Sequence, residues 1–191
     1  HGTMTGTLGA IAMLSFYATK VITTGQGGMV VSQNEDLLEH VRDLRAYDKK
    51  MEYRIRYNYC MTDMQGRMGR IQLEKLPAFL EARRKRAQWY EKHLSGLEGV
   101  VLPKQKGIYY RYVIRITNGR LQNALEQLHQ NGIEAQRPVF SPLHRYLGLG
   151  GFDITEQVFS EALSLPLYPR LTAEQVRYTA RCLSRAMNDC R

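Results

Sequence analysis

Two short apolar runs on either side of a polar, glycine-rich loop constrain the first part of this 191-residue chain most strongly. The first run covers residues 11–14 and the second covers residues 29–31. Short apolar runs bounded by glycine and threonine are typical of strands joined by a loop. We therefore expect strands near residues 11–16 and 28–32, with the loop between them open to a ligand.

The loop between the expected strands carries one lysine, Lys20. Lysine is the side chain that forms Schiff bases with carbonyl cofactors, because burial and nearby cations can lower an amine's pKa. The alternative is an ordinary solvated lysine, since most lysines are exposed. The residues around Lys20 are needed to decide between the two interpretations.

The sequence around Lys20 follows a longer pattern. Ser15-Phe16 precedes the lysine, and the run Gly25-Gln26-Gly27-Gly28-Met29 follows it. This segment resembles the pattern S-F-x-x-x-K-x-x-x-x-G-E-G-G-M of the DegT/DnrJ/EryC1/StrS sugar aminotransferase family. Upstream, the family pattern begins G-[ST]-x-G-D-x-x-x-x before this serine. Two positions depart from it, since Ala10 stands at the usual Asp and Gln26 at the usual Glu.

Three further stretches resemble motifs of the same family, in the same order. Residues 57–69 resemble G-Y-N-x-R-M-x-[ED]-x-Q-A-A-x-G, residues 137–144 resemble R-P-x-F-x-P-L-H, and residues 162–169 resemble A-L-S-L-P-L-[YH]-P. Four ordered motifs across nearly the whole chain are a far more specific signal than one lysine motif. The chain therefore resembles the C-terminal half of an enzyme that depends on pyridoxal 5'-phosphate.

The resemblance implies an α/β fold of the aspartate-aminotransferase type. The chain would hold the C-terminal part of the large cofactor-binding domain and a small α+β C-terminal domain. We expect the remnant of the large domain in residues 1–62, a long connecting helix in residues 63–99 and the small domain in residues 100–191.

Local patterns refine this expectation. Asn34 is a helix N-cap before two acids, and Pro77 should interrupt or bend the long helix of residues 63–94. The segment 46–63 is expected to be an irregular loop. In the last part we expect strands at residues 100–102, 109–116 and 133–135, helices at residues 121–131 and 155–163, and a final helix capped by Thr172. Within the second of these strands, side chains at 110, 112, 114 and 116 alternate with those at 111, 113 and 115, as in a half-buried strand. The final helix should have one apolar face, made by the side chains at 176, 179, 183 and 187.

The resemblance also implies roles for three residues toward pyridoxal 5'-phosphate. Lys20 would form the Schiff base and then move a proton as general base and acid. Ser15 and Asn58 would bind the cofactor phosphate, Asn58 from the second subunit of a homodimer of the full-length protein. A strand-end cap for Ser15 and a turn residue for Asn58 are the alternatives.

Tyr17 and His144 fall where members of the family line the sugar pocket, and Arg137 could bind a substrate phosphate or carboxylate. A core or surface position is the alternative for each. The implied reaction transfers an amino group from glutamate to a keto sugar carried by a nucleotide. Because position 20 is lysine, transamination is favoured over the dehydration of related enzymes that have His or Gln there.

Only 19 residues precede Lys20, whereas the resemblance implies an upstream half with a phosphate loop, a ring-stacking aromatic and an aspartate for the ring nitrogen. We therefore expect the isolated chain to be inactive. The alternative function is a truncated, non-catalytic assembly or binding module.

The formal net charge of +9 raises nucleic-acid binding as a third class. The densest basic run, residues 83–86, lies in a helical pattern with no nucleic-acid-binding motif, so we expect no nucleic-acid partner. No apolar stretch approaches the roughly 20 residues that span a bilayer, so no membrane association is expected. Cys60, Cys182 and Cys190 form no C-x-x-C pair, which argues against a metal site and fits the cytoplasm.

Overall fold

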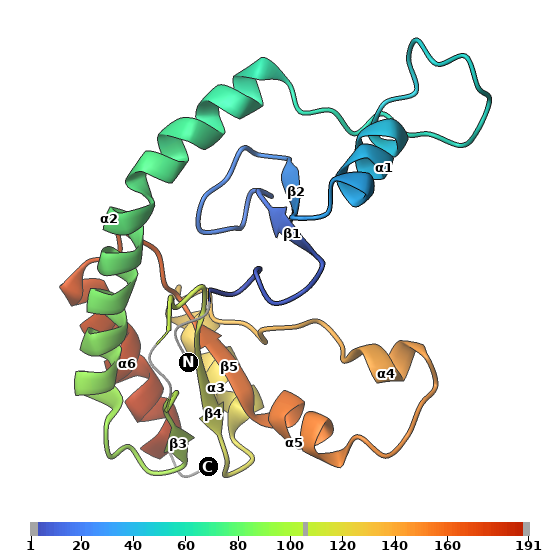
Figure 1. The fold of residues 1–191 in the computed structure, drawn as a ribbon. Coiled ribbons are helices and arrows are strands. Elements are labelled where there is room, and N and C mark those ends of the chain that lie inside the picture. Colours follow the sequence, from blue (N-terminus) through green and yellow to red (C-terminus); the bar gives the residue numbers. More distant parts are fainter. Residues whose placement is uncertain (1–3, 105–106, 189–191) are drawn as a thin grey trace. The chain divides into compact units, whose positions relative to one another are not determined.

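The computed structural model describes residues 4–104 and 107–188. The chain forms two compact units, the first ending at Pro77 and the second beginning at Ala78. Figure 1 traces both units along the chain. Each unit is described by itself below.

The first unit begins with the two expected strands. Strands β1 (Ile11–Ser15) and β2 (Gly28–Ser32) pair antiparallel, with Ser15 opposite Gly28. Helix α1 (Glu35–Arg45) follows, and the Asn34 side chain accepts a hydrogen bond from the Leu37 amide at 3.2 Å. This confirms the predicted N-cap.

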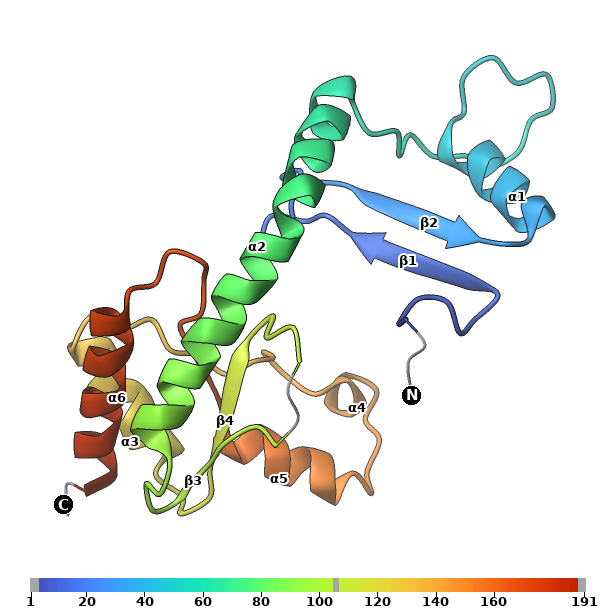
Figure 2. The same ribbon diagram turned by 60° about the vertical axis from the view of Figure 1, so that its left-hand side comes forward.

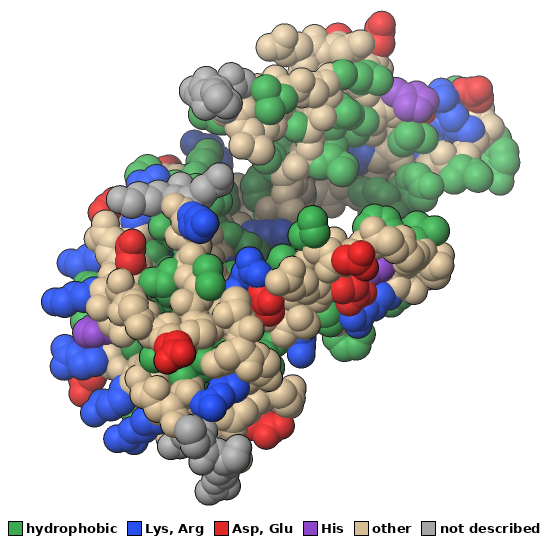
Figure 3. All heavy atoms as spheres, turned by 90° about the horizontal axis from the view of Figure 1, so that it is seen from below, with side chains coloured by type: hydrophobic (Ala, Val, Ile, Leu, Met, Phe, Trp, Pro, Cys, Tyr) green, Lys and Arg blue, Asp and Glu red, His purple; other side chains and the backbone are tan. Residues whose placement is uncertain are grey.

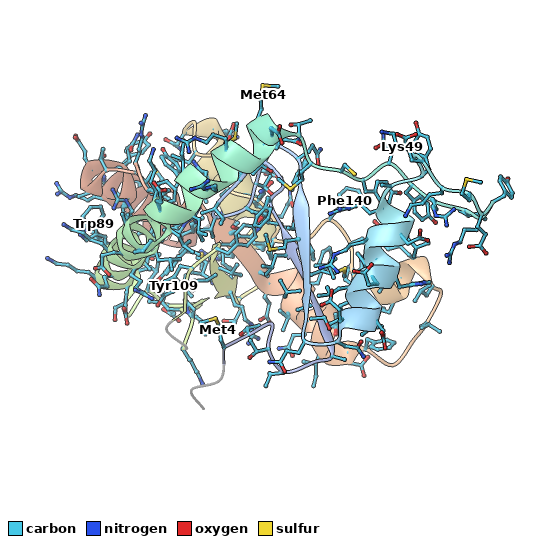
Figure 4. The ribbon with its side chains drawn as sticks, turned by 45° about the horizontal axis from the view of Figure 1, so that its top comes forward. Met4, Lys49, Met64, Trp89, Tyr109 and Phe140 are labelled. Carbon is cyan, nitrogen blue, oxygen red and sulfur yellow. The ribbon has the colours of Figure 1, made fainter. Side chains whose placement is uncertain are left out.

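Residues 46–62 form no helix or strand element, as the sequence predicts. The segment nevertheless returns to the end of α1, because the amides of Tyr57 and Tyr59 donate to the carbonyls of Leu44 and Arg45 at 2.8 and 2.9 Å. Lys49 is labelled on this loop in Figure 4. The backbone bonds fix Asn58, which lies between the two tyrosines, beside the last turn of α1.

The hairpin of the first unit leaves its apolar side chains in solvent. Met13 is 84% exposed, and Leu14 and Met29 are about half exposed. Within the described part of this unit, Thr24 is the one buried residue. Because a two-stranded hairpin is marginally stable by itself, packing around Thr24 has a large share in holding the loop.

Helix α2 (Asp63–Leu94) contributes to both units. The helix continues through Pro77, so the proline does not interrupt it, and the bend given as the other expected outcome stays a prediction.

The second unit is an α+β structure around a small antiparallel sheet. The sheet has the order β3-β4-β5, with strands β3 (Val100–Val101), β4 (Tyr112–Ile116) and β5 (Ala162–Leu165). Its helices are α3 (Leu121–Gln130), α4 (Leu143–Tyr146), α5 (Asp153–Glu161) and α6 (Ala173–Asn188). Figure 2 shows α3 and α6 beside the C-terminal half of α2.

The hydrophobic core of the described residues lies entirely between Ala87 and Met187. The alternation predicted for β4 is confirmed, because Tyr112, Ile114 and Ile116 are buried. Four residues of α6 predicted to share one apolar face are also buried: Val176, Thr179, Leu183 and Met187.

Thr172 caps α6 as predicted. Its hydroxyl accepts from the Gln175 amide at 3.2 Å, and the Gln175 side chain accepts from the Thr172 amide at 2.9 Å. This reciprocal pair is a capping box.

Two strand predictions were wrong. Residues 133–135 form no strand, because the Ala135 amide bonds locally to Ile133 and only Gln136 bridges to Ser164. Strand β5 lies where the end of a helix was expected, since its four consecutive buried residues lack the alternation that marks a half-buried strand.

Strand β4 also begins later than expected, at Tyr112 instead of Tyr109. Tyr109 has φ +49°, and the carbonyls of Tyr109 and Tyr110 accept from the guanidinium of Arg83 at 3.2 and 3.1 Å. These carbonyls are therefore bonded to α2 instead of to a neighbouring strand.

The distribution of the core predicts different costs for two leucine truncations. We expect Leu183→Ala to lower the free energy of unfolding by about 2–5 kcal/mol, because it opens a cavity in the packed core. Leu14→Ala, on the exposed hairpin, should change it by about 0.5 kcal/mol. Urea unfolding followed by the fluorescence of Trp89, the single tryptophan, measures both. Equal costs would contradict a core confined to the second unit.

Candidate functional site

The loop that carries Lys20 is closed by hydrogen bonds to both its ends. The Phe16 amide donates to the Gly27 carbonyl at 2.8 Å, and the Thr24 amide donates to the Phe16 carbonyl at 3.0 Å. The Thr23 hydroxyl donates to the same Phe16 carbonyl at 3.1 Å. A two-stranded hairpin would not by itself order a loop of this length, so these bonds define its conformation.

Lys20 lies on a turn within this loop, because its amide donates to the Tyr17 carbonyl at 2.9 Å. Ser15 ends β1, and its hydroxyl oxygen accepts from the Tyr17 amide at 3.4 Å. That bond uses the oxygen and leaves the hydroxyl proton for another acceptor. Ser15, Tyr17 and Lys20 are all exposed, so the structure brings a hydroxyl and an amine to the surface of one closed loop.

Asn58 lies in the same unit, on the segment that returns to α1. Its side chain is exposed and forms no hydrogen bond within the described ranges. Two residues earlier, the Arg56 side chain is only 4% exposed and its Nε donates to both carboxylate oxygens of Asp43 at 3.1 Å. Asp43 also pairs with Lys50 at 2.9 Å and with Arg54 at 3.2 Å.

Hydrogen bonds from Lys50 and Arg56 lower the pKa of the Asp43 carboxyl to about 2. Asp43 is therefore ionised at neutral pH and gathers three basic side chains of the 46–62 segment. Nothing in the sequence marked Asp43, because the residues that meet it are 7 to 13 positions away on an irregular loop.

His144 and Arg137 lie in the second unit and bind residues of α5. The His144 Nε2 lies 2.7 Å from a carboxylate oxygen of Glu156, and its ring stacks on Phe152. Because a carboxylate only accepts, this nitrogen carries the proton. The Arg137 guanidinium donates to the Phe159 carbonyl at 2.6 Å and lies over the Phe159 ring.

Arg145 binds both oxygens of the same Glu156. Hydrogen bonds from Arg145 and then from His144 lower the pKa of the Glu156 carboxyl to about 2. The predicted substrate residues His144 and Arg137 thus have partners within their own unit. Their roles toward a substrate stay predictions.

Basic side chains gather on the side of the second unit formed by α2 and α6 (Figure 3). Only part of the basic run 83–86 is solvated. Arg84 and Lys85 are exposed, but Arg83 is buried among three backbone carbonyls and Arg86 donates to the Leu171 carbonyl. Part of the dense basic run therefore stabilises the fold.

Two classes of site are unsupported. No group of three acidic, histidine or cysteine side chains within residues 4–104 and 107–188 could hold a metal ion. None of the helices in those ranges combines the length and the apolar character needed to cross a bilayer.

A family profile and curated proteins match most of this chain. The sequence profile of the DegT/DnrJ/EryC1/StrS aminotransferase family matches residues 1–184. GDP-perosamine synthase of Caulobacter vibrioides is 31% identical over 92% of this chain and 52% of its own length. The dTDP-4-dehydro-2,3,6-trideoxy-D-glucose 4-aminotransferase of Saccharopolyspora spinosa is 30% identical over 94% of this chain and 53% of its own.

A solved structure agrees with the fold. The aminotransferase TlmJ from Streptoalloteichus hindustanus superposes with a TM-score of 0.88 at 26% identity, covering 97% of this chain and 54% of that one. The chain thus spans about half the length of the curated relatives it matches.

The ion pairs of Asp43 predict the behaviour of the loop after α1. We expect Asp43→Asn to speed trypsin cleavage after Lys50 and Arg54 by about 10-fold. Without the carboxylate that pairs with its basic side chains, the segment opens more often, and trypsin cleaves the open segment. Asp48→Asn is the matched control, since Asp48 is exposed on the same loop and has no ion pair within the described part of the chain. Equal cleavage of the two variants would show that Asp43 does not hold the loop.

The Glu156 cluster predicts an acid dependence of stability. The pKa of Glu156 is about 2 in the folded chain against 4.5 ordinarily, so its stabilisation is present above pH 4.5 and is lost as the pH falls through about 2. Glu156→Gln should therefore unfold at lower urea than the parent near neutral pH, and the difference should vanish near pH 2. The exposed Glu134→Gln variant is the control. A difference that persists at pH 2 would contradict this assignment.

Proposed function

Because the chain belongs to the DegT/DnrJ/EryC1/StrS aminotransferase family, we propose that Lys20 is the reactive amine of a sugar aminotransferase site. The observation that carries the proposal is the closed loop on which Lys20 and Ser15 are exposed together. An exposed amine on the same loop as a hydroxyl with a proton to donate suits a ligand that has both a carbonyl and an anionic group.

Pyridoxal 5'-phosphate is the cofactor that these donors fit. Lys20 would meet its aldehyde, and the Ser15 hydroxyl would donate to its phosphate. The exposed amide of Asn58 would donate to the phosphate bound by a second copy in a homodimer. When bound, the cofactor supplies an electron sink that stabilises negative charge on the carbon bearing the amino group.

The residues of this chain would bind and move protons. Lys20 holds the proton that leaves the amino-bearing carbon and returns it. Ser15 orients the phosphate. Tyr17, His144 and Arg137 would contact the substrates, with glutamate as amino donor and a nucleotide-linked keto sugar as acceptor.

A trapping experiment tests the role of Lys20. The chain is incubated with pyridoxal 5'-phosphate and reduced with borohydride: each lysine that has condensed with the aldehyde, losing water, takes up hydride and becomes a stable secondary amine. Peptide mass spectrometry then gives the labelling of every lysine. We expect Lys20 to be labelled at least about 10-fold more than the exposed Lys75, because binding orients the reactants.

Two controls sharpen the result. Pyridoxal, which lacks the phosphate, should show a smaller preference for Lys20, and Ser15→Ala should reduce the preference of the phosphorylated probe in the same way. Equal labelling of Lys20 and Lys75 by pyridoxal 5'-phosphate would reject the proposed role and favour a non-catalytic assembly or binding module.

A further inference from the structure

Thr24 lies in the loop of Lys20, where it forms two hydrogen bonds and packs closely against two glycines. It is 4% exposed, whereas Lys20 and Ser15 are exposed. Its hydroxyl donates to the Gln26 carbonyl at 2.6 Å, and its amide donates to the Phe16 carbonyl at 3.0 Å. Thr24 therefore binds the loop at two points on either side of the lysine.

Two glycines make room for the Thr24 side chain. A Cβ added to Gly27 would lie 2.6 Å from the Thr24 hydroxyl and 3.1 Å from the Met61 side chain. The φ of Gly27 is also +151°, in the region that favours glycine. Neither the space nor the backbone at position 27 therefore accepts a side chain.

The second glycine, Gly69, belongs to the first turns of α2. A Cβ added there would lie 3.1 Å from the Thr24 methyl group. The methyl thus packs against the bare backbone of the helix. Figure 2 shows the N-terminal part of α2 beside the loop end of the hairpin. Gly69 and Gly27 each fall in a different sequence motif, and Thr24 is the residue that both contact.

From this packing we infer that Thr24 is a positioning residue for Lys20: its methyl holds the loop against Gly69 of α2 and its hydroxyl fixes the return of the loop to β2. The inference rests on the proposed function of Lys20. Thr24 itself need not touch the ligand. It acts by limiting the conformations that the closed loop can adopt, which sets where the amine stands relative to Ser15.

The two halves of the threonine side chain can be tested separately. Thr24→Val replaces the hydroxyl with a methyl group 2.6 Å from the Gln26 carbonyl, which is too close for carbon and oxygen. We expect this variant to lower the ratio of Lys20 to Lys75 labelling by pyridoxal 5'-phosphate about 10-fold, because the amine loses its orientation. Thr24→Ser keeps the hydroxyl but loses the methyl contact with Gly69, so we expect it to lower the ratio less than Thr24→Val does. Thr5→Val, on an exposed threonine, is the matched control.

Steric complementation tests the contact with α2. Gly69→Ala should lower the same labelling ratio, since its Cβ crowds the Thr24 methyl. The double variant Thr24→Ser/Gly69→Ala should recover the parent ratio, because removing the methyl makes room for the new Cβ. A purely general loss of stability would not be reversed by the second substitution. If Gly69→Ala has no effect, or if the double variant is no better than Gly69→Ala, the inference is overturned.

A second measurement needs no cofactor and separates this inference from the proposed function. Hydrogen exchange of the Lys20 amide, which donates to Tyr17, should be faster in Thr24→Val than in the parent. Equal labelling of Lys20 and Lys75 in the parent rejects the role of Lys20, whereas unchanged amide exchange in Thr24→Val rejects the positioning role. Unfolding followed by Trp89 should be unchanged in every variant, because the core lies between Ala87 and Met187.

Discussion

The closure of the Lys20 loop is the constraint on which the candidate site depends. The hairpin beneath it has exposed apolar side chains and only two strands, so it cannot order a long loop alone. Order comes from backbone bonds to Phe16 and from the buried Thr24, whose methyl packs on Gly69. Without that closure, the amine of Lys20 and the hydroxyl of Ser15 would sample many relative positions, and a ligand would lose the benefit of meeting both.

Ion pairs, not loop closure, hold the segment of Asn58, the residue proposed to contact the cofactor phosphate of a second copy. The segment with Asn58 has no apolar core and is tied to α1 by ion pairs to Asp43 and by two backbone bonds. The Arg56 side chain, only 4% exposed, needs the Asp43 charge, because an unpaired cation shielded from water is strongly destabilising. The second unit relies on hydrophobic packing instead, with polar clusters such as Glu156 and its partners at its edge.

Local sequence patterns predicted the elements whose signals are local. The cap at Asn34, the alternation of β4 and the apolar face of α6 are confirmed because each depends on residues a few positions apart. Strand β5 was missed since a fully buried strand has no alternation. The delayed start of β4 follows from Arg83, which is distant in sequence. In the site, motifs marked Lys20, Ser15 and Asn58, whereas Thr24, Asp43 and Glu156 are evident only from the contacts that folding creates.

Hydrogen exchange of the unmodified chain tests the central claim most directly, because it reads the loop closure itself. The amides of Phe16, Lys20 and Thr24 donate within the loop, whereas Ala18, between them, has no such bond among the described residues. The account predicts that the three bonded amides exchange at least about 10-fold more slowly than that of Ala18. Exchange of all four at the rate of an unfolded chain would contradict a closed loop and, with it, the basis for the proposed site.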